Sequence, residues 1–166
     1  PSIILKGQKA KGEVISVSVA NKNQIQDSGA KIIHCAPKTT SNVLARCICK
    51  NGGIASYRGA VKVNSGAVKS RSKISCNAMI LDNKSRSNTY PAINTLGVLA
   101  NIEHEASMTK IDEDKLYYLM LCGLDEKDCQ ALLVNGFLEP FIRHLPLEYA
   151  VEINKLIEME MEGSVG

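Results

Sequence analysis

Apolar and polar residues alternate with a period of two over much of the first two thirds of the chain. This alternation is typical of half-buried β-strands. We predict strands at residues 14–20, 30–36, 42–50 and 57–63. Turn-forming Asn, Gly and Ser residues separate these segments, including a long polar stretch at 21–29. Residues 1–13 show no clear period, and we expect them to be irregular.

The hydrophobic period changes to that of an α-helix in the last third of the chain. We expect Asp112 to cap a first helix that ends at Gly123, and Asp125 to cap a second. The second helix should end before Pro140, which interrupts the next turn. Pro146 suits the first residue of a third helix. The pattern therefore predicts a β-rich body followed by a small helical part.

Short repeats indicate how the strands are arranged. The sequence Gly-Ala-Val-Lys occurs at 59–62 and again at 66–69, and Lys-Ser-Arg-Ser occurs at 69–72 and 84–87. Short strands, small residues and imperfect repeats favour a stacked parallel β-solenoid over a sandwich of hairpins, which remains the alternative. The expected class is mainly β with α, divided into a β-helical segment at 1–111 and a helical domain at 112–166.

Composition narrows the choice of function. Of the 166 residues, 45% are hydrophobic, enough for a core, and no apolar run approaches the length of a membrane span. The chain begins without Met and has no signal-peptide pattern, so we expect a piece of a longer protein. Residues 1–90 carry a net charge of +12 and residues 91–166 one of −9. Few aromatic residues accompany the basic half, which argues against nucleic-acid binding.

Six cysteines in a chain of this size suggest reduced thiols in a compartment like the cytosol. Cys76 follows Lys73, whose charge would lower the pKa of the thiol and favour the thiolate. From the residues alone, the favoured explanation is instead that Cys76 is a small buried hydrophobic residue. Cys47 and Cys49 should share one face of a strand, and together with Cys35 they could hold zinc, although packing in the core is the favoured explanation.

The triplet Glu103, His104 and Glu105 is the densest group of polar residues. It falls where basic, strand-like segments give way to acidic, helical ones. On a strand the two glutamates point to one face and His104 to the other. Paired carboxylates suit metal binding or proton transfer. The alternative to such a site is a solvent-exposed rim of the fold in which His104 is half buried. Phosphate-binding loops and nucleophile elbows are absent from the sequence.

Several segments together resemble a known family. They are residues 56–63, 76–81, 85–91, 102–107, 134–137, 145–151 and 164–166. This set is similar to the C-terminal part of the SufB/SufD family of iron–sulfur cluster assembly scaffold proteins, and the Glu-His-Glu triplet resembles its SufB branch. The resemblance runs from about residue 12 to the end.

The resemblance implies a right-handed parallel β-helix followed by a small helical domain. It implies a non-catalytic scaffold that holds a transient iron–sulfur cluster, [2Fe–2S] or [4Fe–4S], and transfers it to acceptor proteins. Cys76 and Glu105 would bind the metal, with His104 and Glu103 beside them. Thiolate suits iron–sulfur ligation, and carboxylate or imidazole ligands hold a cluster more weakly.

The resemblance also implies partners. A SufD-like subunit, or a second copy, would join through the β-helix, and the ATPase SufC would dock on the helical domain and supply ATP hydrolysis. A cysteine desulfurase system would donate sulfur. The expected location is the cytoplasm or a plastid stroma, with neither nucleic acid nor membrane bound.

Departures from the family pattern leave an alternative open. Asn77, Asn88 and Asn94 stand where acidic residues are commoner in the family. The upstream half of the family protein is also missing. A SufD-like or degenerate subunit that only partners the ATPase is the alternative, and it differs in whether Cys76 and Glu105 converge. An enzyme acting on polysaccharide would need an aromatic-lined cleft, and the chain is poor in aromatics.

Overall fold

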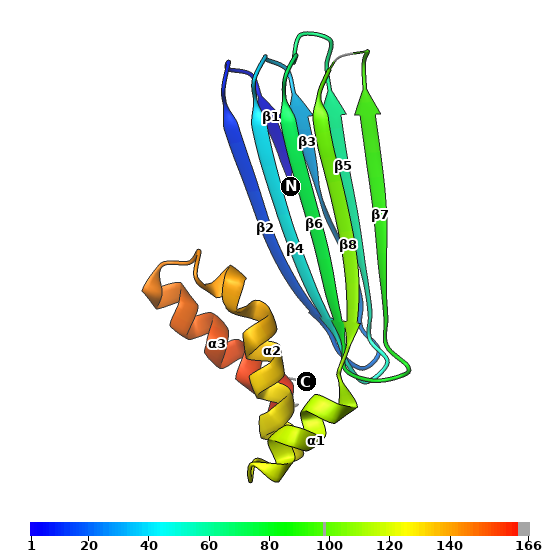
Figure 1. Ribbon diagram of the computed structural model, residues 1–166, viewed down its shortest axis with the longest axis vertical. Helices are drawn as coiled ribbons and strands as arrows, with labels where there is room; N and C mark the ends of the chain where they lie inside the picture. Colours follow the sequence, from blue (N-terminus) through cyan, green and yellow to red (C-terminus); the bar gives the residue numbers. More distant parts are fainter. Residues whose placement is uncertain (98, 163–166) are drawn as a thin grey trace. The chain divides into compact units, whose positions relative to one another are not determined.

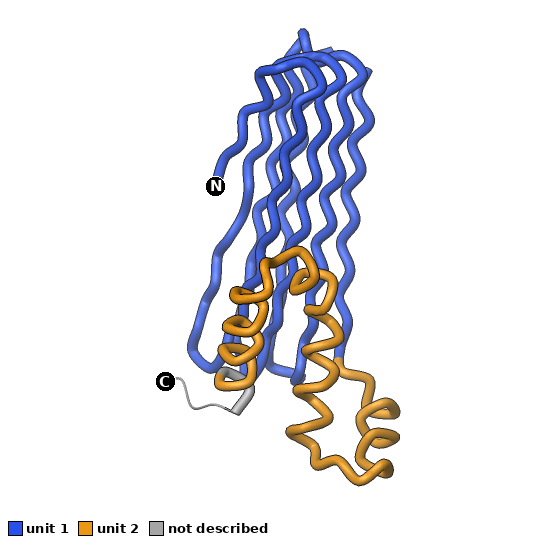
Figure 2. Tube along the Cα trace, turned by 90° about the vertical axis from the view of Figure 1, so that its left-hand side faces the viewer, with its two compact units in different colours: residues 1–110 blue, residues 111–166 orange. Residues whose placement is uncertain are grey.

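The computed structural model describes residues 1–97 and 99–162. Within these residues eight strands are followed by three helices (Figure 1). The chain divides into two compact units, Pro1–Lys110 and Ile111–Gly166 (Figure 2). The first unit is built of strands and the second of helices. The segment 164–166, which contributed to the resemblance, lies outside the described residues.

The strands form two parallel sheets. Their bounds are β1 Ser2–Leu5, β2 Lys11–Ala20, β3 Ile25–His34, β4 Thr40–Cys49, β5 Ile54–Val63, β6 Arg71–Ile80, β7 Arg86–Thr95 and β8 Asn101–Lys110. The strand order is β1-β3-β5-β7 in one sheet and β2-β4-β6-β8 in the other, so successive strands alternate between the two sheets. Lys11 pairs with Thr40 and Ile54 with Arg86, and one coil therefore takes 29 to 32 residues. The predicted parallel β-solenoid is confirmed, with about four coils, and the sandwich is excluded because no hairpin pairing occurs among the described strands.

Two expectations about the strands are wrong. Residues 1–13 are not irregular, since they contain β1 and the start of β2. The polar stretch 21–29 is not all turn, because β3 begins at Ile25. In a solenoid the neighbouring coil supplies the hydrogen bonds of each strand, so polar residues can belong to a strand without a hydrophobic partner beside them. Asp27 of β3 illustrates this, since its carboxylate accepts from Arg58 Nε on β5 at 3.0 Å.

Side chains that point between the two sheets form the core of the first unit. The main cluster of buried residues is Leu5, Ala30, Ile32, Val43, Ala45, Tyr57, Val61, Val63, Ala67, Ile74 and Cys76. A buried polar network lies near one corner, where His34 Nδ1 is 2.7 Å from Thr39 Oγ1 and His34 Nε2 is 3.0 Å from Ser41 Oγ. Ser41 donates in turn to Ser72 on the next coil, at 2.8 Å. Every buried polar group of this corner thus has a partner.

The second unit consists of α1 Glu113–Leu121, α2 Glu126–Ile142 and α3 Leu147–Glu162. Asp112 caps α1 and Asp125 caps α2, as predicted. The expected interruption at Pro140 is wrong, because α2 continues to Ile142. Pro140 lies in the last turn of α2, where its missing N–H removes a single helical hydrogen bond. No helix within residues 1–97 and 99–162 is long and apolar enough to cross a membrane.

Candidate functional site

Cys76 lies on β6 with its side chain in the interior of the solenoid. The residue is 4% exposed and belongs to the main core cluster together with Ile74 and Tyr57. Residues two apart on a strand point to the same face, so Ile74, Cys76 and Ala78 line the interior together. The thiol of Cys76 therefore lies in an environment with little water.

The triplet 103–105 lies on β8, which pairs with β6 and is the last strand of its sheet. Ile74 pairs with His104 and Ser75 with Glu105. Because laterally paired residues face the same side, His104 points to the interior with Ile74, and Glu105 points outward with Ser75. Burial agrees, since His104 is half-buried whereas Glu103 and Glu105 are exposed. The predicted alternation of the triplet is confirmed.

The interior positions of Cys76 and His104 bring a thiol and an imidazole together. Cys76 Sγ lies 3.9 Å from His104 Nε2, across adjacent coils. Sulfur and imidazole nitrogen are both ligands that iron accepts. Two donors on neighbouring strands at the end of the solenoid are thus in place on one face of the sheet.

Lys73 does not activate Cys76 as the sequence suggested. Its position differs from that of Cys76 by an odd number, so the two side chains point to opposite faces of β6. Burial, followed by the charge of nearby Cys47, raises the pKa of Cys76 to about 11. A buried thiol with its pKa raised in this way keeps its proton at neutral pH. The residues alone favoured a small buried Cys76 over a thiolate beside Lys73, and the buried position is confirmed.

The structure does not bring the two glutamates to Cys76. Glu105 lies on the outer face of the sheet, and Glu103 Oε1 there accepts from Asn101 Nδ2 at 3.1 Å. In the part of the chain that the structure describes, no three His, Cys, Asp or Glu side chains lie close enough to hold a metal ion. Iron binding by Glu105, with Glu103 beside it, stays a prediction.

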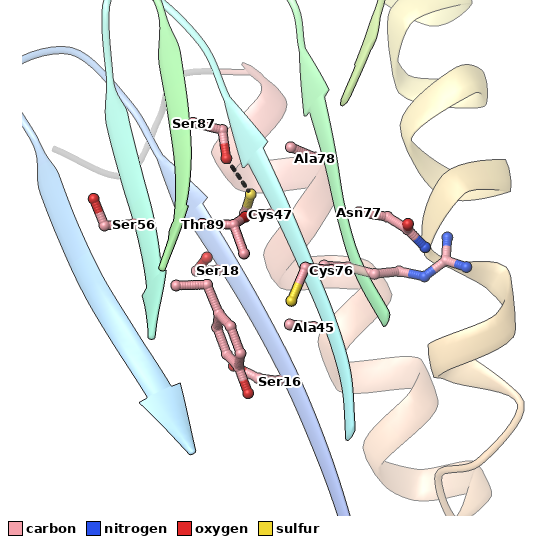
Figure 3. A pocket seen from close by; sticks show the side chains of 12 residues that line it. Ser16, Ser18, Ala45, Cys47, Ser56, Cys76, Asn77, Ala78, Ser87 and Thr89 are labelled. Carbon is pink, nitrogen blue, oxygen red and sulfur yellow. Dashed lines mark hydrogen bonds between the residues drawn. The ribbon is translucent and has the colours of Figure 1, made fainter. Parts of the chain in front are cut away.

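A small cavity lies next to Cys76 in the interior and is lined by residues of both sheets (Figure 3). It has room for about one water molecule. Cys47 of β4 and Cys76 of β6 both line it, and Ser87 of β7 lines it from the opposite sheet. The dashed line in Figure 3 marks the 3.1 Å hydrogen bond between Cys47 Sγ and Ser87 Oγ.

Cys47 differs from Cys76 in its ionisation. A hydrogen bond with Cys49 lowers the pKa of Cys47 to about 7, burial opposes this shift, and the hydrogen bond with Ser87 adds to it. The same pairing raises the pKa of Cys49, and burial raises it further. The Cys49 thiol has one hydrogen, which it donates either to Cys47 or to the Arg86 carbonyl at 3.3 Å. The pair therefore loses its first proton from Cys47.

The sequence placed Cys47 and Cys49 on one face, but it did not connect them with Cys76. The strand register makes this connection, because Ala45 pairs with Cys76 and Cys47 follows on the same face. Cys35, proposed as a third zinc ligand, instead accepts a hydrogen bond from Asn64 Nδ2 at 3.4 Å. Cys47 and Cys76 are separated by about one coil of sequence, and this spacing is the signal that could have brought them together.

Comparison with known proteins identifies the family. Residues 1–137 match the family described as "SUF system FeS cluster assembly, SufBD core domain". The chain belongs to the SufB/SufD family. The match covers the whole solenoid, including Cys76 and the triplet at 103–105, and extends through α1 into α2.

Individual relatives agree with this assignment. The iron–sulfur cluster assembly protein SufB of Bacillus subtilis is 47% identical over 166 residues, all of this chain and 36% of that protein. A SufBD family protein of Staphylococcus aureus is 46% identical over the same length and the same share. A SufBD family protein of Mycobacterium tuberculosis is 47% identical, with 20% of its length covered. The chain thus spans between one fifth and about one third of these SufB/SufD relatives.

Proposed function

We propose that the chain is part of a SufB-type scaffold on which a transient iron–sulfur cluster is assembled and from which it passes to acceptor proteins. The observation that carries the proposal is the 3.9 Å approach of Cys76 Sγ and His104 Nε2 at the last coil. Membership of an iron–sulfur assembly family gives this pair of donors its chemical context. The chain acts as a non-catalytic holder, and ATP hydrolysis belongs to the partner ATPase.

The chemistry of the pair suits a cargo that must be released. Iron takes the thiolate of Cys76, so binding displaces the proton that burial holds on the sulfur. Imidazole from His104 binds iron more weakly than a second thiolate would. A cluster of the [2Fe–2S] or [4Fe–4S] type ordinarily takes four protein ligands. Further ligands come from outside this pair, with Glu105 the candidate from this chain.

The ends of the two sheets support a partner on the β-helix. β7 and β8 are the last strands of their sheets, and each has one paired side within the described residues. Ile93 of β7 is 48% exposed and Met108 of β8 is 56% exposed. Open strand edges with apolar side chains invite pairing with another chain. A SufD-like subunit, or a second copy, would pair here and bring ligands beside Cys76.

The helical unit supports a second partner. α1 exposes Tyr117, Tyr118 and Leu121, which are 65%, 67% and 68% exposed. Exposed aromatic residues of this kind are enriched at protein interfaces. We assign this surface to the SufC ATPase, and a cysteine desulfurase system supplies the sulfur.

The test is anaerobic reconstitution of the full-length protein in its complex, with iron and sulfide, followed by visible absorption and iron counting. Cys76→Ala should abolish the cluster while leaving the complex assembled. His104→Ala and Glu105→Ala show which further side chain of this chain binds iron. If all three variants reconstitute as the wild type does, the chain is a structural subunit that only partners the ATPase.

A further inference from the structure

One end of the solenoid carries a column of lysines. The turns that lead into β2, β4 and β6 lie together at this end (Figure 1). Lys9, Lys38 and Lys69 occupy equivalent positions in the three turns and are all exposed. The Lys9 N–H donates to the Pro37 carbonyl at 3.1 Å, and the Lys38 N–H donates to the Val68 carbonyl at 2.9 Å. Neighbouring strands of a sheet lie about 4.8 Å apart, so three like charges are stacked at roughly this spacing.

The backbone does not require lysine in this column. Lys9, Lys38 and Lys69 have positive φ angles of 61°, 58° and 58°. In the turns at the other end of the solenoid, Asn23 and Asn51 have φ angles of 61° and 56°. Asn tolerates this left-handed conformation better than Lys does, and Gly tolerates it best. Lysine in three successive coils therefore needs a reason other than the geometry of the turn.

The solenoid does not neutralise the charge of the lysine column. Residues 28–81 contain neither Asp nor Glu, and Lys11 and Arg71 add two cations where β2 and β6 begin. In the part of the chain that the structure describes, none of these five cations forms an ion pair. The first carboxylate along β2 is that of Glu13, which accepts from Asn42 Nδ2 at 3.0 Å. Like charges held together repel one another, and an anionic partner would relieve this repulsion.

A second, apolar column runs beside the lysines. Pro37, Val68 and Leu99 supply the carbonyl groups that accept from the three lysines, so they too are stacked one coil apart. Val68 is 45% exposed and Leu99 is 86% exposed. Apolar side chains with this exposure are commonly covered by a partner when they adjoin a charged strip. The two columns together therefore fit a helix that carries an acidic row beside an apolar row.

The chain itself contains such a helix in α3. Leu147 and Val151 lie four residues apart and are 76% and 62% exposed. Glu148 and Glu152 follow them directly with the same spacing, and both are exposed. Residues four apart lie on one side of a helix, about 6 Å apart along its axis, so these residues form an apolar row and an acidic row. Neither glutamate forms an ion pair within residues 1–97 and 99–162.

We propose that the lysine column is a self-association surface, on which α3 of a second copy of the chain lies. The two glutamates pair with Lys38 and Lys69, whose long side chains bridge the difference between the two spacings, and the apolar row of α3 covers Val68 and Leu99. The net charges of +12 for residues 1–90 and −9 for residues 91–166 favour this approach of two copies. A nucleic acid fits the surface less well, because the turns at 6–10, 35–39 and 64–70 contain no aromatic residue that could stack on bases.

The experiment measures self-association of the full-length protein by analytical ultracentrifugation. All samples carry Met108→Lys, so that pairing at the edge of β8 does not contribute. The starting protein should self-associate at low ionic strength and less so as salt is added, because salt screens exposed charges. Reversing the column with Lys38→Glu and Lys69→Glu should raise the Kd more than about tenfold, since like charges would then meet. Reversing the helix with Glu148→Lys and Glu152→Lys should have the same effect.

Mixing the two charge-reversed proteins gives the decisive result. Each alone opposes like charges, whereas a mixed pair opposes an acidic column to a basic helix and a basic column to an acidic helix. Association should therefore return in the mixture. A starting protein that does not self-associate would overturn the inference, as would a mixture of folded variants that stays dissociated. Should a reversed protein not fold by circular dichroism, Lys38→Gln with Lys69→Gln tests the same contact, and unchanged association would overturn it.

A matched control separates this contact from a general attraction between charged copies. Lys31→Glu with Lys62→Glu changes the net charge equally at exposed positions of β3 and β5, and it should leave association unchanged. Loss of association in this control would overturn the inference. So would binding to phosphatidylserine vesicles or to a single-stranded oligonucleotide that replaces self-association and is lost with Lys38→Glu and Lys69→Glu. The contact involves no ligand of the cluster, so its failure leaves the proposed function to the reconstitution of Cys76→Ala.

Discussion

Replacing Tyr57 with phenylalanine should stabilise the protein, although the change deletes a polar group from the core. The substitution removes one oxygen atom and leaves the ring in place. Tyr57 is 5% exposed, and its hydroxyl has no partner among the described residues. Burial, followed by the proximity of Cys76, raises the pKa of Tyr57 to about 12, so the hydroxyl stays protonated at neutral pH. The wild type therefore buries a donor that no acceptor within the described part of the chain satisfies.

The size of the effect follows from two opposing contributions. A buried polar group without a partner costs about 1–3 kcal/mol. Deleting the oxygen leaves a void on the order of 15 Å³, which costs roughly 0.4 kcal/mol at about 24 cal/mol per Å³. The net stabilisation should be roughly 0.6–2.6 kcal/mol. Each kcal/mol raises the Tm of a chain of this length by about 2–4 °C.

Thermal unfolding of Tyr57→Phe followed by circular dichroism measures this gain. Tyr90→Phe is the matched control, because Tyr90 is 48% exposed and stacks against Arg58 at 4.8 Å, so its hydroxyl should contribute little. A Tm of Tyr57→Phe that falls below the wild type would refute the reasoning, since it would mean that the hydroxyl already has a partner.

Three further predictions test other parts of the solenoid. Gly53→Ala should destabilise the protein by about 1–3 kcal/mol in urea unfolding, because its Cβ would lie 2.2 Å from the Ala20 carbonyl oxygen. Burial would raise the pKa of Asp82, but hydrogen bonds from Ser85, Lys84 and Gly52 outweigh burial and lower the pKa. The free energy of unfolding should therefore fall as pH drops below about 3.9. Urea unfolding at several pH values should show a smaller decline for Asp82→Asn than for the wild type. Met108→Lys should weaken subunit pairing in size-exclusion chromatography without changing the circular dichroism spectrum.

The class of fold was predictable because it depends on local patterns. Alternation and turn residues located β2 to β5, and small residues with imperfect repeats favoured coils over hairpins. The repeats that suggested a solenoid, at 59–62 and 66–69, do not follow the coil period. Coils differ by up to three residues because their turns differ in length, as the pairs Lys11–Thr40 and Ile54–Arg86 illustrate. A variable period hides the register from inspection of one sequence.

The candidate site was predictable in its residues but not in its contacts. Cys76 and the triplet stood out by type and resemblance, and the alternation of the triplet followed from strand geometry. Which strand faces which is a property of register, so the Cys76–His104 approach and the cavity shared with Cys47 were not visible. Exposure was also missed. The helical period predicts packing for both Cys122 and Cys129, yet Cys122 is exposed and only Cys129 is buried.

The orientation of β8 decides which of its side chains can share a metal with Cys76. In the observed register His104 faces Cys76 and Glu105 faces the other side. A shift of β8 by one residue against β6 would exchange the two faces, turning Glu105 inward and His104 outward. β8 is paired on one side by β6, so such a shift breaks one set of strand hydrogen bonds rather than two.

Comparing His104→Ala with Glu105→Ala in the same reconstitution therefore reports the register of β8 when the cluster is bound. Loss of iron in His104→Ala alone means that β8 keeps the observed register. Loss in Glu105→Ala alone means that β8 shifts on loading, and amide hydrogen exchange of β8 should then change between the empty and the loaded protein. Loss of iron in Glu105→Ala alone, with unchanged exchange, would contradict a shift and would place Glu105 beside ligands from the partner subunit instead.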